Sequence, residues 1–166
     1  MEDSLSIIFA MIVALLLMFL FPLIDTWELQ DNLSYAVVYA ATTDFVDTIR
    51  NVGYITEDAY NNYTSALATT GNTYEVTMEH RRFNNDLKAY LYTYTNEILD
   101  EIYNDTDGDG KFSYKLDKFD YFYVTVKNTN RTQATILSDF FAGSSATNFK
   151  IGCSYGGVVW SVRDEM

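Results

Sequence analysis

The chain has 166 residues, of which 48% are hydrophobic, and its 23 acidic and 11 basic residues give a formal net charge of -12. This charge argues against nucleic-acid binding, because phosphate recognition needs clustered Lys and Arg side chains that displace counterions. It also argues against docking onto anionic lipid head groups. The single cysteine, Cys153, excludes an intramolecular disulfide.

The first expected element is a membrane helix. No charged residue occurs from Leu5 to Ile24, and this apolar run is long enough to cross about 30 Å of hydrocarbon as a helix. A cleavable signal peptide fits less well, because Met1–Ser4 is acidic rather than basic and no small-x-small cleavage site follows. Since Arg50 is the first basic residue, the positive-inside rule assigns no orientation.

The helical pattern continues beyond Pro22, which should kink the helix rather than end it. Apolar residues recur at spacings of three and four, with acidic residues between them. They are Trp27, Leu29, Leu33, Val37, Ala40, Ala41, Phe45 and Ile49. The sequence therefore predicts one kinked helix over residues 1–52, on the order of 70 Å long, with Gly53 as its C-terminal cap. Residues 5–24 would face lipid or neighbouring subunits, and the second half would pack on a head.

The pattern of residues 53–166 predicts that this head is an α+β unit with a small antiparallel sheet of three or four strands. One face of the sheet should lie on the distal half of the long helix, because so small a sheet needs a covering layer. The expected elements are a helix from the N-cap Thr56 through Leu67, a strand at 73–80, a helix at 87–103 (or a strand at 90–95), a strand at 119–127, a helix at 132–141, and a hairpin of 150–155 and 158–162 that turns at Gly156–Gly157.

An acidic, glycine-rich segment matches the opening of an EF-hand-type calcium loop. Carboxylates alternate along it, so that oxygen ligands can curl around one hard cation, and Gly110 stands at the sharp turn. Leu116 occupies the place of the usual bidentate glutamate, so the site would be weak or completed one residue later. The alternative is an acidic turn without a metal. The candidate ligands are Asp105, Asp107, Asp109, Lys111, Ser113 and Asp117.

Catalytic motifs are absent from the sequence: it has no phosphate-binding glycine loop, no G-x-S-x-G and no H-E-x-x-H. We therefore expect that the protein is not an enzyme. The run His80–Arg82 after a predicted strand favours a solvated basic edge that blunts strand pairing, with anion binding as the alternative. The tyrosines of 90–94 favour core and interface packing over a sugar-stacking platform.

The order of these segments resembles that of type IV pilins and pseudopilins: an apolar N-terminal helix with Pro22, then an amphipathic half that carries a small sheet. The specific match is confined to about the first 30 residues. The resemblance implies helices that leave the membrane and pack side by side in a filament core. The family carries glutamate at the fifth residue, where this chain has Leu5; Glu2 and Asp3 could pair with a neighbour's terminal amine instead. The segments DTWE, GNTYEV, DYFYVTVKNTN and YGGVVW also look like small proteins of Gram-positive tight-adherence-type or conjugative pilus systems.

We therefore expect a structural subunit of an extracellular type IV pilus-like filament. It would lie in the cell membrane of a Gram-positive bacterium before assembly, and its partners would be copies of itself and the pilus assembly machinery. The predicted assembly residues are Glu2, Asp3, Ile8, Ile12, Leu16, Phe19 and Pro22. The alternative is a monomeric, membrane-anchored surface binding module stiffened by calcium, the one candidate cofactor.

Overall fold

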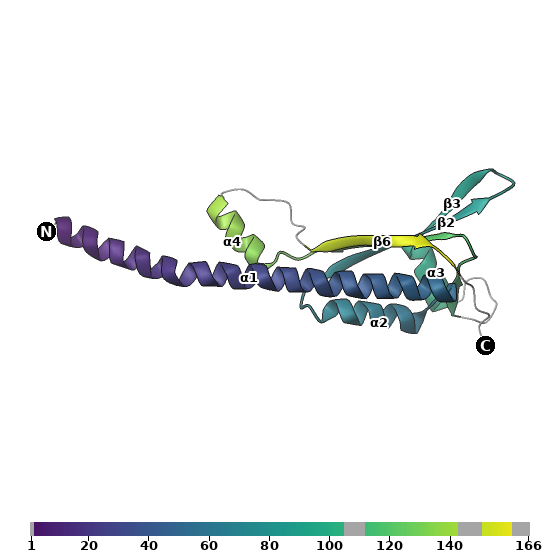
Figure 1. Cartoon of the computed structure of the whole chain (residues 1–166), viewed down its shortest axis with the longest axis horizontal. Helices are drawn as coiled ribbons and strands as arrows, with labels where there is room; N and C mark the ends of the chain where they lie inside the picture. The colour runs from purple at the N-terminus through teal and green to yellow at the C-terminus, as the bar shows by residue number, and fades with distance from the viewer. Residues whose placement is uncertain (1, 105–111, 143–150, 161–166) are drawn as a thin grey trace.

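The computed structural model describes residues 2–104, 112–142 and 151–160, and a single long helix dominates it (Figure 1). This helix, α1 (Glu2–Val52), runs through Pro22 without interruption, and its axis bends within its N-terminal half (Figure 1). The bend is expected where proline removes one N–H donor, and the Thr26 hydroxyl donates to the Pro22 carbonyl at 2.7 Å. Gly53 ends the helix with φ 85° and donates its N–H to the Ile49 carbonyl. The predicted long helix and its glycine cap are confirmed.

The head follows α1 as a mixture of short helices and strands. Its elements are β1 (Tyr54–Thr56), α2 (Glu57–Ala68), β2 (Tyr74–Asn84), β3 (Ala89–Tyr94), α3 (Thr95–Asn104), β4 (Ser113–Lys115), β5 (Tyr121–Asn128), α4 (Gln133–Ala142) and β6 (Gly152–Val158). Four strands form an antiparallel sheet in the order β3-β2-β5-β6, and β1 pairs with β4 separately. Thr56 caps α2 as predicted, because its side chain accepts from the Ala59 N–H at 3.2 Å. The fold is α+β, with a long N-terminal helix packed on a small antiparallel sheet.

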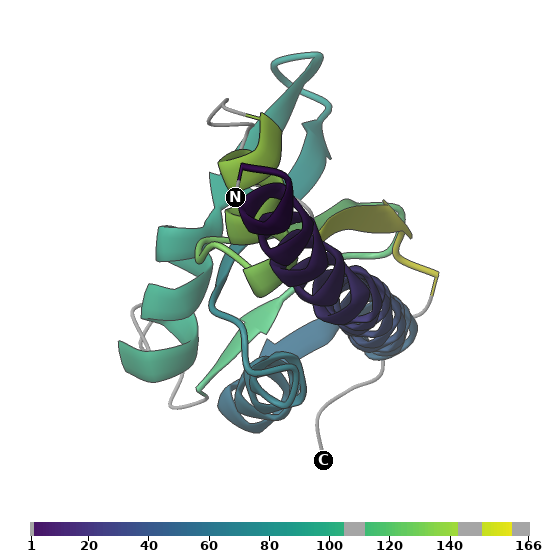
Figure 2. The same cartoon turned by 90° about the vertical axis from the view of Figure 1, so that its left-hand side faces the viewer.

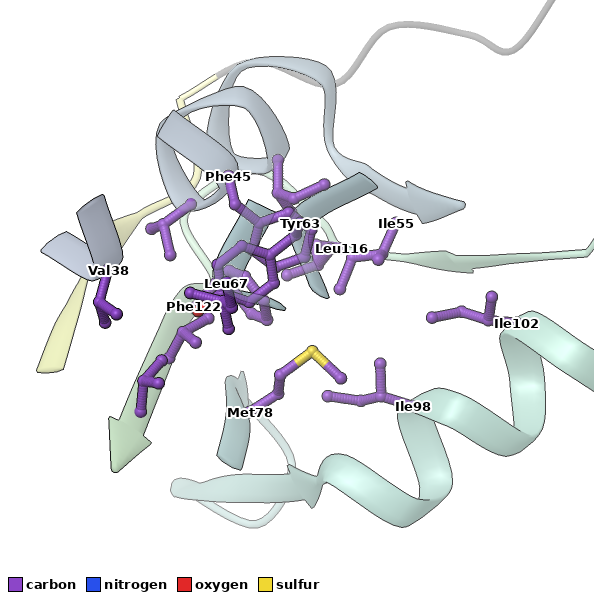
Figure 3. Packing of buried hydrophobic residues seen from close by; sticks show 14 of the residues in the cluster. Val38, Phe45, Ile55, Tyr63, Leu67, Met78, Ile98, Ile102, Leu116 and Phe122 are labelled. Atoms are coloured by element: carbon purple, nitrogen blue, oxygen red, sulfur yellow. The ribbon is translucent and has the colours of Figure 1, made fainter. Parts of the chain in front are cut away.

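The core lies between the distal half of α1 and one face of the sheet. Phe45 of α1 stacks on Tyr63 of α2 and meets Phe122 of β5 edge-on. On the same sheet face, Met78 points towards Ile98 of α3, so the second cover of the sheet is α3 (Figure 3). Figure 2 looks along α1 from its N-terminal end and shows most of the head elements on one side of the helix. These contacts rigidly attach the distal half of α1 to the head.

Two predicted elements are wrong in whole or in part. Residues 89–94, expected as the start of a helix over 87–103, form β3 and pair with β2 from Asn84↔Ala89 to Glu79↔Tyr94, as in the strand alternative at 90–95. The helix prediction is correct from Thr95 onwards, where α3 begins. The alternation of large aromatic residues suits a strand whose side chains pack on their cross-strand neighbours. The predicted turn at Gly156–Gly157 does not exist either. Both glycines lie inside the continuous strand β6, paired with Tyr123 and Phe122 of β5.

Candidate assembly interface

The apolar half of α1 projects beyond the head and is uncovered. None of its most hydrophobic 18-residue window is buried within the chain. The predicted assembly residues Ile8, Ile12, Leu16 and Phe19 lie here, with side chains between 51% and 72% exposed. Pro22 follows them, also exposed, and the structure describes the backbone of Glu2 and Asp3 in the first turn. An apolar surface this large in water marks a place that lipid or protein must cover.

Large apolar side chains are distributed around the whole circumference of this half, rather than along one stripe. The exposed ones include Leu5, Ile7, Phe9, Met11, Leu15, Leu17, Met18, Phe21 and Leu23. A helix that is apolar on all sides is stable only inside a membrane or within a bundle of other helices. The half is long and apolar enough to cross a membrane, a property that a signal sequence near the N-terminus shares.

The boundary between the free and the docked half is marked by polar contacts near Asp31. The Thr132 hydroxyl, just before α4, donates to the Asp31 carboxylate at 2.7 Å. One turn later the buried Ser34 hydroxyl accepts from the Asn72 amide at 3.5 Å. Farther along, the Thr42 hydroxyl lies 3.0 Å from the Tyr63 hydroxyl, and burial raises the pKa of Tyr63. The head therefore holds α1 from about Trp27 onwards, α4 lies beside the turns before it, and most of residues 5–24 stay exposed (Figure 1).

Arg50 anchors the C-terminal end of α1 to the sheet edge, a role that sequence reasoning missed. Its Nε donates to the Val158 carbonyl and its Nη1 to the Asp47 carboxylate, each at 2.8 Å. The Trp160 ring lies 5.2 Å from the guanidinium carbon. A Cβ at Gly157 would stand 2.9 Å from that same carbon, so a side chain at this position would displace the guanidinium. The one sequence signal was that Arg50 is the only basic residue in an acidic helix.

The candidate calcium ligands are only partly placed. Asp105, Asp107, Asp109 and Lys111 lie outside the described residues. Ser113 starts β4, and its buried hydroxyl has no hydrogen-bond partner, whereas Asp117 pairs with Arg82 at 3.1 Å. Leu116 is buried in the core. In the described parts of the chain, no group of three or more His, Cys, Asp or Glu side chains could hold a metal ion.

The predicted basic edge at 80–82 is wrong, because β2 is an inner strand between β3 and β5. His80 is 3% exposed; its Nε2 lies 2.8 Å from the Asp120 carboxylate and its Nδ1 lies 2.6 Å from the Tyr114 hydroxyl. Burial lowers the pKa of His80, and the hydrogen bond to Asp120 opposes this only in part. A neutral ring that donates to Asp120 and accepts from Tyr114 satisfies all three groups. The cluster thus joins β2, β4 and the loop before β5.

Comparisons of the chain with protein-family models, with curated proteins and with solved structures gave no match. The geometry of the molecule itself is therefore the guide to its function. In that geometry, one helix carries two surfaces of opposite character: a distal half buried against the head and a largely exposed, apolar N-terminal half. The N-terminal half of α1 is the candidate site, and it is long and apolar enough to cross a membrane.

Proposed function

We propose that the protein is a structural subunit of an extracellular type IV pilus-like filament, held in the cell membrane before assembly. The observation that supports this is the exposure of the apolar window in α1, none of whose residues is buried, next to a distal half of the same helix that the head buries. A membrane anchor alone requires length and apolarity. A filament subunit also requires that the anchor stand clear of the head, so that neighbouring helices can surround it.

The energetics require that lipid around this helix be replaced by another apolar cover, which other copies of the helix can supply. Burying one large aliphatic or aromatic side chain is worth about 1.5–3 kcal/mol relative to water. These residues therefore cannot move from the membrane into water without another apolar cover. In a helix bundle, side chains such as Ile12, Leu16 and Phe19 would contact equivalent apolar helices, and packing rather than hydrophobic transfer would decide the outcome. Glu2 and Asp3, at the start of α1, are the acids available to pair with a neighbour's terminal amine.

The position of the head agrees with such a bundle. It flanks α1 from about Trp27 onwards, because Trp27 and Thr132 line the same pocket, and α4 points back beside the preceding turns of α1 (Figure 1). Helices packed through residues 5–24 would therefore place their heads around the outside of the filament. The same arrangement accounts for the concentration of the acidic residues outside the apolar run, where water solvates them.

The test is electron microscopy of filaments sheared from cells that express the chain from its own locus. Leu16→Asp should abolish filaments, since a charged residue at the centre of an apolar helix costs about 2.5–3.5 kcal/mol in a membrane and more in a dry bundle. Leu87→Asp is the matched control: the same substitution at an exposed leucine of the head (65% exposed, against 57% for Leu16). It should leave filaments intact.

Regular filaments from the Leu16→Asp variant would contradict packing through the apolar half. If the unmodified chain is found only in the membrane fraction and never in filaments, the proposal fails. The monomeric anchored binding module would then be the better description.

A further inference from the structure

The sheet has a second face, opposite to α1, on which aromatic side chains gather. Residues that pair across antiparallel strands point to the same face, and the register aligns Arg81 with Tyr92 on one side and with Tyr121 on the other. The intervening residues, such as His80 and Phe122, point into the core. We call this surface the outer aromatic face, and its rings are Phe83, Tyr90, Tyr92, Tyr94, Tyr121 and Tyr123.

The rings of the outer aromatic face form a connected layer over three strands. Phe83 meets Tyr90 edge-on at 5.3 Å between ring centres, and Tyr90 meets Tyr121 at 6.3 Å. The Arg81 guanidinium lies between Tyr92 (5.6 Å) and Tyr123 (4.8 Å). The layer reaches β6 because a Cβ at Gly156 would stand 2.3 Å from the Tyr123 ring. The glycine leaves room for the ring to lie across the strand.

No helix of the described chain covers this layer, since α1 and α3 both pack on the opposite face. Phe83, Tyr90, Tyr92 and Tyr94 are 46–52% exposed. Exposed tyrosines around an arginine are characteristic of the central residues of protein interfaces, where rigid rings contribute contact area at little entropic cost. The face is also broad and lies on the pleated surface of a sheet, which suits a partner of similar size better than a small molecule.

The charges on this face indicate which partner it fits. Its charged side chains on β2, β3, β5 and β6 are Glu75, Glu79, Arg81 and Lys127, so its formal charge is zero in a chain of net charge -12. Glu79 and Arg81 form an ion pair, and Glu75 is the register partner of Lys127. Identical acidic heads repel one another through their other surfaces, but two outer aromatic faces, each of zero formal charge, can approach without repulsion. A two-fold axis between Glu79 and Arg81 would place each opposite the other residue of a second copy.

We propose that the outer aromatic face is a self-recognition surface, by which the heads of two copies of this chain meet face to face. The contact uses the side of the sheet away from α1. It is therefore separate from assembly through the apolar helices, and does not depend on the filament proposal. Two copies joined at this face would keep both α1 helices free for packing elsewhere.

Cross-linking of the full chain in detergent micelles tests the proposal. In a Cys153→Ser background, Tyr92→Cys should give a covalent dimer with a short bis-maleimide. Tyr103→Cys, a comparably exposed tyrosine on α3 (40% against 49%), should give little. Leu16→Asp in the same molecules separates the two proposals: dimers through Tyr92→Cys should persist, while contacts through α1 are lost. Equal cross-linking from both tyrosine positions, or loss of the Tyr92→Cys dimer in Leu16→Asp, would overturn the proposal.

A charge reversal gives a second, independent test by light scattering of the same micelles. Arg81→Glu should weaken dimerisation at least about tenfold, because like charges then face each other. Arg131→Glu, an exposed arginine also paired with an acid, should have no effect. The double variant Glu79→Arg/Arg81→Glu restores neutrality and should restore the dimer, which a misfolded head could not do. A monomeric wild type at all concentrations, or an undiminished Arg81→Glu dimer, would refute self-recognition.

Discussion

Replacing Phe45 by alanine should release α1 from the head. The Phe45 side chain is 6% exposed, its ring lies parallel to Tyr63 at 4.4 Å, and it meets the edge of Phe122 at 6.3 Å. Truncation removes these contacts and leaves a cavity between α1, α2 and β5, for which the expected cost is about 3–5 kcal/mol. Since domains of this size are stable by about 5–15 kcal/mol, the loss would be a large part of the total.

Phe19→Ala is the matched control, because it makes the same substitution in the same helix at a side chain that is 72% exposed. No packing against the head is lost there, so the free energy of unfolding should change by less than about 0.5 kcal/mol. In filament formation the order of the two effects should reverse. Phe19→Ala should impair filaments more, because it removes an expected packing contact between subunits, whereas Phe45→Ala acts within one subunit.

The assay is urea unfolding of the full chain in detergent micelles, followed by the fluorescence of Trp160. This residue reports on the docked end of α1, because its backbone N–H donates to the Arg50 carbonyl at 3.0 Å and its ring lies against the Arg50 guanidinium. Trp27→Phe in every variant leaves Trp160 as the only tryptophan. Equal destabilisation by Phe45→Ala and Phe19→Ala, or a loss below about 1 kcal/mol for Phe45→Ala, would refute the assignment of Phe45 to the core.

Three further outcomes are expected. Because burial lowers the pKa of His80, the unfolded chain takes up a proton below about pH 6.5 that the folded head resists. Stability should therefore fall on acidification more steeply in the wild type than in His80→Gln, by up to about 1.4 kcal/mol per pH unit; parallel curves from urea titrations would contradict a neutral buried ring. Asp107→Ala should lower the thermal midpoint only in the presence of calcium, and an equal loss with a chelator would identify the segment as a simple turn. Gly157→Ala should destabilise the head by about 1–3 kcal/mol by displacing Arg50, whereas Ser154→Ala on the opposite face of β6 should be nearly neutral in the same urea titration.

Local signals in the sequence were sufficient for α1 and for both of its halves. The charge-free run from Leu5 to Ile24, the three- and four-residue spacing after Pro22, and Gly53 as the cap all act within a few residues of the chain. The same holds for the N-cap at Thr56. Such features depend on neighbours along the helix, so no tertiary contact is needed to specify them.

Where a sequence pattern is compatible with two local structures, only the tertiary fold decided between them. The glycine pair 156–157 is typical of a turn, yet both glycines pair with β5 inside β6, where neighbouring side chains occupy the space that a Cβ would take: Tyr123 at Gly156 and Arg50 at Gly157. Residues 89–94 became β3 because β2 offers a partner edge for their aromatic alternation. The run at 80–82 became an inner strand for the same reason, which buried His80 against Asp120.

The sequence by itself determined that this protein has an apolar helix long enough for a membrane and an acidic head of mixed helices and strands. Composition and periodicity suffice for that, since both are properties of contiguous residues. The tertiary structure decided where the head holds the helix, and hence that most of residues 5–24 stay exposed. It also brought Tyr92, Arg81 and Tyr123 from three strands onto one face. Strand order and register set those contacts, and they depend on pairing between segments far apart in the chain.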